Sequence, residues 1–309
     1  MISQSITLAS SAKVNLYLHV LGKRPDGFHE LLTLFERIDL KDTIEIDRIA
    51  GSFIEIFCAD PRVPQDRTNL AVKAAEAFCQ AAGISDGIRI TIDKKIPVSG
   101  GLGGGSSNAA VVLQGLQQMY GNPLPEKRLE EIARTLGSDV PFFLHPEPFA
   151  VGTGRGDQIQ RLDFQPNLWH LLVAPGFPIS TKEVYRAFAA SRTSGAGPST
   201  GLGAGLTASG ADVTLLQAAL KSDDFGRIRS LLFNALEPTV EALYPAIMDV
   251  KAAIQTDGGI PCPMVSGSGS TVMALCSSQK EAEKAAESIV RREPGWQVFV
   301  VKTGSISDG

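Results

Sequence analysis

Apolar and polar residues alternate along some stretches of the chain, which predicts strands, and recur at helical spacing along others. The clearest alternation lies in residues 10–20. It assigns to one face Ala12, Val14, Leu16, Leu18 and Val20, and to the other face Lys13, Asn15, Tyr17 and His19. An antiparallel strand with one solvated face is the ordinary interpretation of this pattern. The alternative is that Lys13 and Asn15 point together into a site.

The remaining patterns predict a mixture of strands and helices. Strands are predicted over 88–93, 169–174 and 297–302, and two alternating segments around Gly51, within 44–57, predict a hairpin. Helices are predicted over 68–82, 108–120, 126–136, 212–220, 224–236, 240–255 and 279–291. Residues 191–210 are rich in Ser, Gly and Ala without apolar periodicity, which predicts a mobile loop. Together these elements indicate an α+β protein.

A glycine-rich loop stands between the strand at 88–93 and the helix from 108. Five of the six residues from Gly100 to Gly105 are glycine, and Ser106 and Ser107 follow. Such a loop can turn backbone N–H groups toward an anion, and the helix adds its free N–H groups and the positive end of its dipole. A flexible surface turn is the alternative, but strongly patterned elements on both sides favour a phosphate-binding loop.

This loop fits neither of two common phosphate-binding patterns. The form G-x-x-x-x-G-K-[ST] requires Lys where Gly105 stands. The dinucleotide form G-x-G-x-x-G requires Gly where Ser106 stands. The sequence therefore predicts a phosphate site of another class.

Composition narrows the function classes. The 309 residues are 43% hydrophobic and 20% charged, as in folded globular proteins. A formal net charge of −4 gives no basic surface for nucleic acid. The four cysteines form no C-x-x-C pair and the four histidines form no H-E-x-x-H pattern, so a zinc site is not indicated. Neither a signal sequence nor an apolar run of membrane-spanning length is present, and we expect a cytoplasmic protein without a membrane partner.

The run from Pro97 to Ala110 reads P-x-x-x-G-L-G-x-G-S-S-x-A-A and resembles the ATP-binding motif of the GHMP kinase superfamily. The ATP contacts that the resemblance implies are Pro97, Gly100, Gly101, Leu102, Gly103, Gly104, Gly105, Ser106 and Ser107, with Ser106 or Ser107 near Mg²⁺. It also implies a two-domain fold: a half like ribosomal S5 domain 2 over 1–160 and a ferredoxin-like half over 161–309. The second glycine run, Val265 to Leu275, resembles a further motif of the superfamily that packs beside the phosphate loop.

Two more segments carry the catalytic residues that the resemblance implies. The strand at 10–20 contains A-K-x-N-L, which supplies Lys13, and the run from Gly137 to Phe143 reads G-x-D-V-P-F-F, which supplies Asp139. Asp139 would accept the proton of the attacking hydroxyl or only orient it. From the residues themselves, Asp139 reads as a helix cap, and Lys13 with Asp139 as a structural ion pair. The sequence does not separate these roles.

The segment from Arg24 to Leu31 resembles R-P-D-G-Y-H-E-L, which marks the 4-diphosphocytidyl-2-C-methyl-D-erythritol kinase branch of that superfamily. The resemblance implies phosphorylation of the 2-hydroxyl of this substrate in the non-mevalonate isoprenoid pathway. The substrate contacts that it implies are Asn15, Phe28, His29 and, more loosely, Thr181 and Tyr185. Phe28 stands where the branch most often has Tyr, a change that retains stacking on cytosine but removes a hydroxyl.

Several alternatives remain at this stage. Another GHMP kinase, acting on mevalonate, homoserine or a sugar, would share the phosphate loop but would not need residues that recognise cytosine. A nucleotide or sugar sensor would share the fold without the chemistry. The glycine run from Gly152 to Asp157 is interpreted as a structural turn, and Asn234 receives no role. We expect a monomer or a homodimer.

Overall fold

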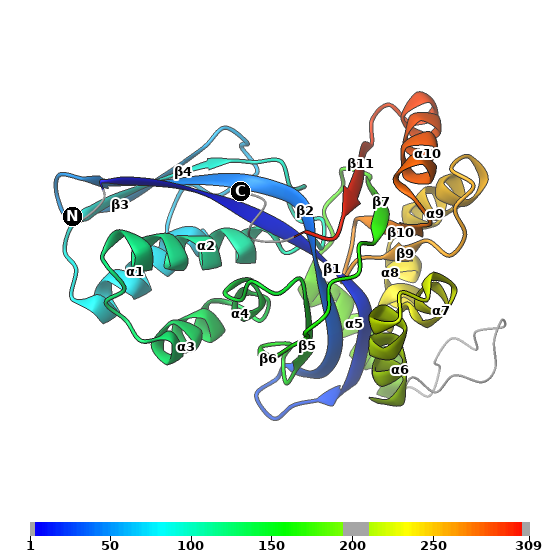
Figure 1. Cartoon of the computed structure of the whole chain (residues 1–309), viewed down its shortest axis with the longest axis horizontal. Coiled ribbons are helices and arrows are strands. Elements are labelled where there is room, and N and C mark those ends of the chain that lie inside the picture. Colours follow the sequence, from blue (N-terminus) through cyan, green and yellow to red (C-terminus); the bar gives the residue numbers. More distant parts are fainter. Residues whose placement is uncertain (1–3, 194–209, 305–309) are drawn as a thin grey trace.

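Two β-sheets form the framework of the computed structural model, which describes residues 4–193 and 210–304 (Figure 1). The larger sheet has the order β3-β4-β2-β1-β8, with β5 paired to β2 and to β6. Its strands are β1 (Ser5–Lys23), β2 (His29–Ile49), β3 (Ile54–Cys58), β4 (Gly87–Asp93), β5 (Phe149–Thr153), β6 (Gln158–Arg161) and β8 (Phe233–Asn234). The smaller sheet has the order β11-β7-β10-β9 and consists of β7 (Trp169–Ala174), β9 (Met264–Val265), β10 (Val272–Cys276) and β11 (Gln297–Lys302).

The helices of the two halves of the chain lie at different ends of the molecule (Figure 1). Those from the first half of the chain are α1 (Leu70–Ala82), α2 (Gly104–Met119), α3 (Glu126–Leu136) and α4 (Val140–Phe143), and they share a buried apolar cluster with the larger sheet. Those from the second half are α5 (Thr181–Thr193), α6 (Gly210–Lys221), α7 (Phe225–Leu231), α8 (Glu237–Leu243), α9 (Ala246–Thr256) and α10 (Gln279–Arg292). The predicted α+β class is confirmed. None of the helices in the described part of the chain has the length and apolar character of a membrane span.

Strand β1 corrects the predicted division of its two faces. The pairing of β1 with β2 shifts register between Asn15 and Tyr17, which marks a bulge at Leu16. Because an extra residue reverses the alternation, Tyr17 joins Leu16 in the buried core, and Leu18 lines the same cavity as Lys13 and Asn15. The solvated-face interpretation is wrong, since Lys13 and Asn15 are buried. In agreement with the alternative, both line one cavity.

The predicted hairpin around Gly51 is also wrong. Strand β3 pairs in parallel with β4, and β4 lies between β3 and β2. Ile88, Ile90 and Ile92 of β4 are buried and share an apolar cluster with residues of α1 and α2. Alternation identifies strands but does not identify their partners. The prediction therefore pairs β3 with β2, its neighbour in the sequence, whereas in the structure β3 pairs with β4.

Two of the predicted helices end early or break. The helix predicted over 224–236 ends at Leu231, because Phe233–Asn234 pairs with β1 and the Asn234 amide donates to Val265 O and Gly267 O. The helix predicted over 240–255 divides into α8 and α9 at Tyr244, which precedes Pro245 and leaves the helical conformation. The predictions for 126–136, 169–174 and 297–302 are confirmed. The predicted mobile loop, apart from its ends, lies outside the described residues.

Candidate active site

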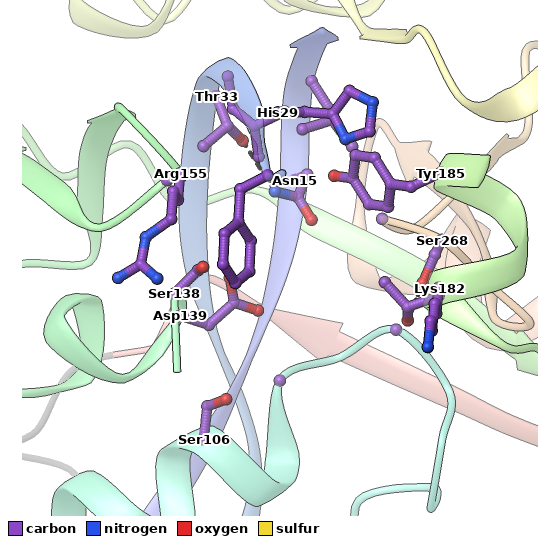
Figure 2. Close-up of a pocket in the computed structure, with 18 of the residues that line it drawn as sticks. Asn15, His29, Thr33, Ser106, Ser138, Asp139, Arg155, Lys182, Tyr185 and Ser268 are labelled. Atoms are coloured by element: carbon purple, nitrogen blue, oxygen red, sulfur yellow. Dashed lines mark hydrogen bonds between the residues drawn. The ribbon is translucent and has the colours of Figure 1, made fainter. Parts of the chain in front are cut away.

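A cavity of about 1200 Å³ lies where β1, the start of α2, α4, α5 and two glycine loops meet (Figure 2). The residues predicted for the site that line it are Lys13, Asn15, Phe28, His29, Gly101, Gly103, Ser106, Asp139, Thr181 and Tyr185. The predicted residues that do not line it are Pro97, Gly100, Leu102, Gly104, Gly105 and Ser107. The fold thus brings segments far apart in the sequence to one cavity of a size that suits a small-molecule ligand.

The glycine loop presents a helix start to the cavity. Helix α2 begins at Gly104, inside the glycine run, and its cap residue Gly103 has a φ of 72°. A Cβ atom added at Gly105 would have no atom within 4 Å, so the first turn is open to a ligand. Ser106 lines the cavity, whereas Ser107 is buried and its hydroxyl accepts a hydrogen bond of 2.8 Å from Ser10. Of the two predicted hydroxyls, therefore, only that of Ser106 faces the cavity.

The second glycine loop, residues 266–271 between β9 and β10, packs directly against the first. Gly101 has a φ of 77°, and a Cβ atom there would lie 2.3 Å from the carbonyl oxygen of Ser266. The backbone N–H of Thr271 donates to Gly100 O over 3.2 Å. This contact confirms the predicted packing of the two loops and explains why Gly101 carries no side chain.

Buried polar groups hold the entry to the phosphate loop in place. Asp42 is fully buried, and its carboxylate accepts hydrogen bonds from the backbone N–H groups of Lys95 and Ile96. It also accepts from the Asn108 amide over 2.9 Å and pairs with the Lys94 ammonium at 2.5 Å. Since all these donors satisfy one buried carboxylate, Asp42 fixes the loop relative to β2. Sequence reasoning gave Asp42 no role.

Lys13 is fixed beside Asp139. Its Nζ donates to Asn15 Oδ1 at 2.7 Å and to Gly101 O at 3.1 Å, and lies 3.6 Å from Asp139 Oδ2. Asp139 stands before α4, but its side chain makes no capping hydrogen bond. One third of the Asp139 side chain is exposed to the cavity, whereas Lys13 is buried. The geometry therefore leaves the Asp139 carboxylate available to a ligand.

Two aromatic contacts form the other end of the cavity. The Phe28 side chain is about half exposed, and the Arg155 guanidinium lies 4.8 Å from its ring centroid. The His29 ring lies 5.1 Å from the Tyr185 ring with an angle of 33° between their planes. His29 Nε2 is buried without a hydrogen-bond partner among the described residues. Burial and then Lys23 lower the pKa of His29, so its ring is neutral near pH 7 and can offer a donor or an acceptor to a ligand.

Helix α5 contributes two of the predicted residues. Ser180 caps this helix, since its hydroxyl accepts from the Glu183 N–H. Thr181 shares a hydrogen bond of 2.8 Å with Ser268 of the second glycine loop. Burial and the charge of Asp139 raise the pKa of Tyr185, which keeps its hydroxyl protonated.

Arg155 is one of several lining residues that the sequence did not predict for the site, because the turn at 152–157 is interpreted there as structural. Pairing of β5 with β2 places Gly152 opposite Thr33, and the Leu31 N–H donates to Gly154 O over 2.7 Å. This pairing brings Arg155 beside Phe28. The only signal in the sequence was a charged residue between two glycines, which is insufficient without the pairing.

Comparisons with known proteins agree with this geometry. The family model described as GHMP kinases N terminal domain matches residues 69–147, and that described as GHMP kinases C terminal matches residues 216–294. A curated relative from Geobacter sp. (strain M21), named 4-diphosphocytidyl-2-C-methyl-D-erythritol kinase, is 39% identical over 97% of this chain and 99% of its own length.

Solved structures are similar over nearly the whole chain. A 4-(cytidine 5'-diphospho)-2C-methyl-D-erythritol kinase has a TM-score of 0.74 and 32% identity, over 97% of this chain and 100% of its own. A homoserine kinase from Cytophaga hutchinsonii has a TM-score of 0.72 at 21% identity, over 99% of this chain and 96% of its own. At that identity, the homoserine kinase supports the fold only.

Proposed function

The chain belongs to the GHMP kinases, and within them to the 4-diphosphocytidyl-2-C-methyl-D-erythritol kinases, and from this membership we propose how its cavity carries out the reaction. The enzyme transfers a phosphoryl group from ATP to an alcohol of 4-diphosphocytidyl-2-C-methyl-D-erythritol; we take the 2-hydroxyl as the acceptor. One observation carries the proposal: a single cavity joins the start of α2 and the Lys13–Asp139 pair to the Phe28–His29 segment.

The triphosphate of ATP would lie against the start of α2. The open space at Gly105 and the free N–H groups of the first helical turn suit an anion. Ser106 offers a hydroxyl oxygen to Mg²⁺, which takes oxygen ligands and usually binds through phosphate oxygens as well. When bound, Mg²⁺ neutralises negative charge on the phosphate oxygens. We assign the contact to Ser106 rather than Ser107, because the Ser107 hydroxyl is buried against Ser10.

Lys13 and Asp139 would act on the transferred phosphoryl group and its acceptor. Phosphoryl transfer passes through a loose transition state, so the enzyme mainly places the acceptor in line and balances charge. The exposed Asp139 carboxylate would accept the proton of the acceptor hydroxyl or orient it. Lys13 is held by Asn15 and by Gly101 O, which keeps its positive charge next to the phosphate loop.

The other end of the cavity would bind the cytidine. We propose that cytosine stacks on Phe28 and that His29, whose Nε2 has no partner among the described residues, hydrogen-bonds the edge of the base. Thr181 and Tyr185 would form the wall on the α5 side, where Tyr185 now packs on His29. Asn15 would contact the part of the substrate that reaches Lys13.

An ADP-release assay tests the function. With ATP, Mg²⁺ and 4-diphosphocytidyl-2-C-methyl-D-erythritol, we expect turnover that mevalonate, homoserine and free sugars do not support. Preference for one of these other acceptors would favour a different GHMP kinase. Binding of both substrates without ADP release would favour a sensor.

Phe28→Ala should raise the KM for the cytidyl substrate by about 5- to 150-fold, because stacking of a base on an aromatic ring is worth about 1–3 kcal/mol. The KM for ATP and kcat should change little. Phe57→Ala is the matched control, since Phe57 is equally exposed but lies on β3, outside the cavity. An unchanged KM in Phe28→Ala would remove the stacking assignment.

We also propose a cytoplasmic location, which the four free cysteines support, since reduced thiols are typical of that compartment. Light scattering distinguishes a monomer from a homodimer.

A further inference from the structure

The Phe28 ring, which would stack on the base, is exposed, and few contacts within its own segment restrain it. It follows a tight turn in which the Gly27 N–H donates to Arg24 O and the Arg24 N–H donates to Phe28 O. About half of the side chain is exposed, and Phe28 belongs to none of the three apolar clusters in the described part of the chain. A ring that is placed only by a surface turn would lose conformational freedom when a base stacks on it, and this loss would weaken binding.

Arg155 supplies the support that the turn lacks. Its guanidinium lies over the Phe28 ring, 4.8 Å from the centroid. A guanidinium is planar and stacks on aromatic faces, so it can restrain the ring on one side and leave the other side free for a ligand. Figure 2 draws Arg155 and Tyr185 on opposite sides of the cavity, with Asn15 between them.

The guanidinium is itself fixed. Arg155 Nε and Nη2 donate to Asp157 Oδ2 over 3.3 and 2.8 Å, and Nη2 also donates to Arg134 O over 3.1 Å. The Arg155 backbone N–H donates to Asp157 Oδ1. Asp157 is buried, and therefore cannot swing away with the arginine. Because both side chains are held, the face that meets Phe28 is set before any ligand arrives.

The same contacts argue against direct binding of an anion by Arg155. Asp157 places a carboxylate against the guanidinium at 2.8 Å and compensates its charge. Two of the three guanidinium nitrogens are already occupied by Asp157 and Arg134 O. Of the guanidinium nitrogens only Nη1 is left without these partners, and Arg155 also makes the stacking contact with Phe28.

We propose that Arg155 is a positioning residue for the substrate: it holds the Phe28 ring in place, so that the cytosine stacks on a surface that is already ordered. This inference rests on the proposed function for the role of Phe28, and goes beyond it by assigning the glycine turn at 152–157 to substrate recognition. Asp157 acts through Arg155 in the same arrangement.

A double-mutant cycle tests the proposal by steady-state kinetics. Arg155→Met should raise the KM for the cytidyl substrate by about 2- to 30-fold, the range of a cation–π contact, with kcat and the KM for ATP within about twofold of wild type. In the Phe28→Ala background, the same change should add less than about twofold. Arg161→Met is the control, because Arg161 lies on β6 and pairs with Glu126 and Glu147 outside the cavity.

Three results would overturn the proposal. An unchanged KM in Arg155→Met would show that the contact has no effect. An equal increase in the Phe28→Ala background would show that Arg155 acts on the substrate independently, for example on its diphosphate. A loss confined to kcat would place Arg155 in the chemical step instead.

Binding of CDP, measured by titration calorimetry, separates this proposal from the proposed function. Arg155→Met should weaken CDP binding by the same factor as it raises KM, whether or not the protein turns over the cytidyl substrate. Absence of turnover by the wild type would contradict the proposed function, whereas unchanged CDP affinity in Arg155→Met would contradict the role of Arg155. Arg155→Lys gives a second variant if the first does not fold; it keeps the charge without the planar face and should fall between wild type and Arg155→Met.

Discussion

Asp139→Ala should lower kcat by about 10²- to 10⁴-fold, the range for loss of a positioned acid or base, while ATP binding persists. The reason is the geometry of the cavity: the Asp139 carboxylate is one third exposed, makes no capping hydrogen bond, and lies 3.6 Å from the buried Lys13. ADP release measures kcat, and calorimetry with a non-hydrolysable ATP analogue measures nucleotide binding. Near-normal turnover would refute the catalytic assignment.

Asp139→Asn separates a proton acceptor from an orienting group. The amide retains the size and one oxygen of the carboxylate but cannot take a proton at neutral pH. A loss as large as that of Asp139→Ala would favour the base, and a much smaller loss would favour orientation. Asp163→Asn is the control, because Asp163 is an exposed carboxylate that does not line the cavity.

The sequence predicted most of this catalytic end because its residues lie in short, contiguous patterns. The strand pattern over 88–93, the glycine run from Gly100 and a helical pattern follow one another directly, and the structure has all three elements. Helix α3 was predicted to the residue, since its apolar stripe ends at Gly137. Local periodicity is sufficient where local interactions decide the structure.

The errors arose where partners distant in the sequence decide the structure. The bulge at Leu16 depends on pairing with β2 and reverses the faces of β1 beyond it. Asn234 ends a helical pattern by bonding to the loop at 265–267. Arg155 became a site residue only through the pairing of β5 with β2. No pattern within a single segment contains these pairings.

Gly101→Ala should destabilise the protein by about 2–4 kcal/mol, which lowers the melting temperature by roughly 3–6 °C in a chain of this size. The new Cβ would lie 2.3 Å from Ser266 O and 2.9 Å from Gly269 O, and the residue would have to keep a φ of 77°. Both obstacles are backbone atoms, which cannot rotate away as a flexible side chain can. Relief of the clash requires the two glycine loops to separate, and Lys13 would then lose its bond to Gly101 O.

Gly105→Ala should leave stability intact and instead weaken ATP binding. Comparing it with Gly101→Ala therefore distinguishes a glycine required by the fold from a glycine required for binding phosphate. A Cβ at Gly105 meets nothing within 4 Å, and in the first turn of α2 alanine is the better helix former, so stability should hold or rise slightly. If the phosphates of ATP approach this turn closely, the same methyl group should raise the KM for ATP. Gly295→Ala, equally open but on the turn between α10 and β11, should change neither quantity. Normal ATP affinity in Gly105→Ala would mean that the phosphates of ATP do not contact this turn, because the added methyl group would then not be in their way.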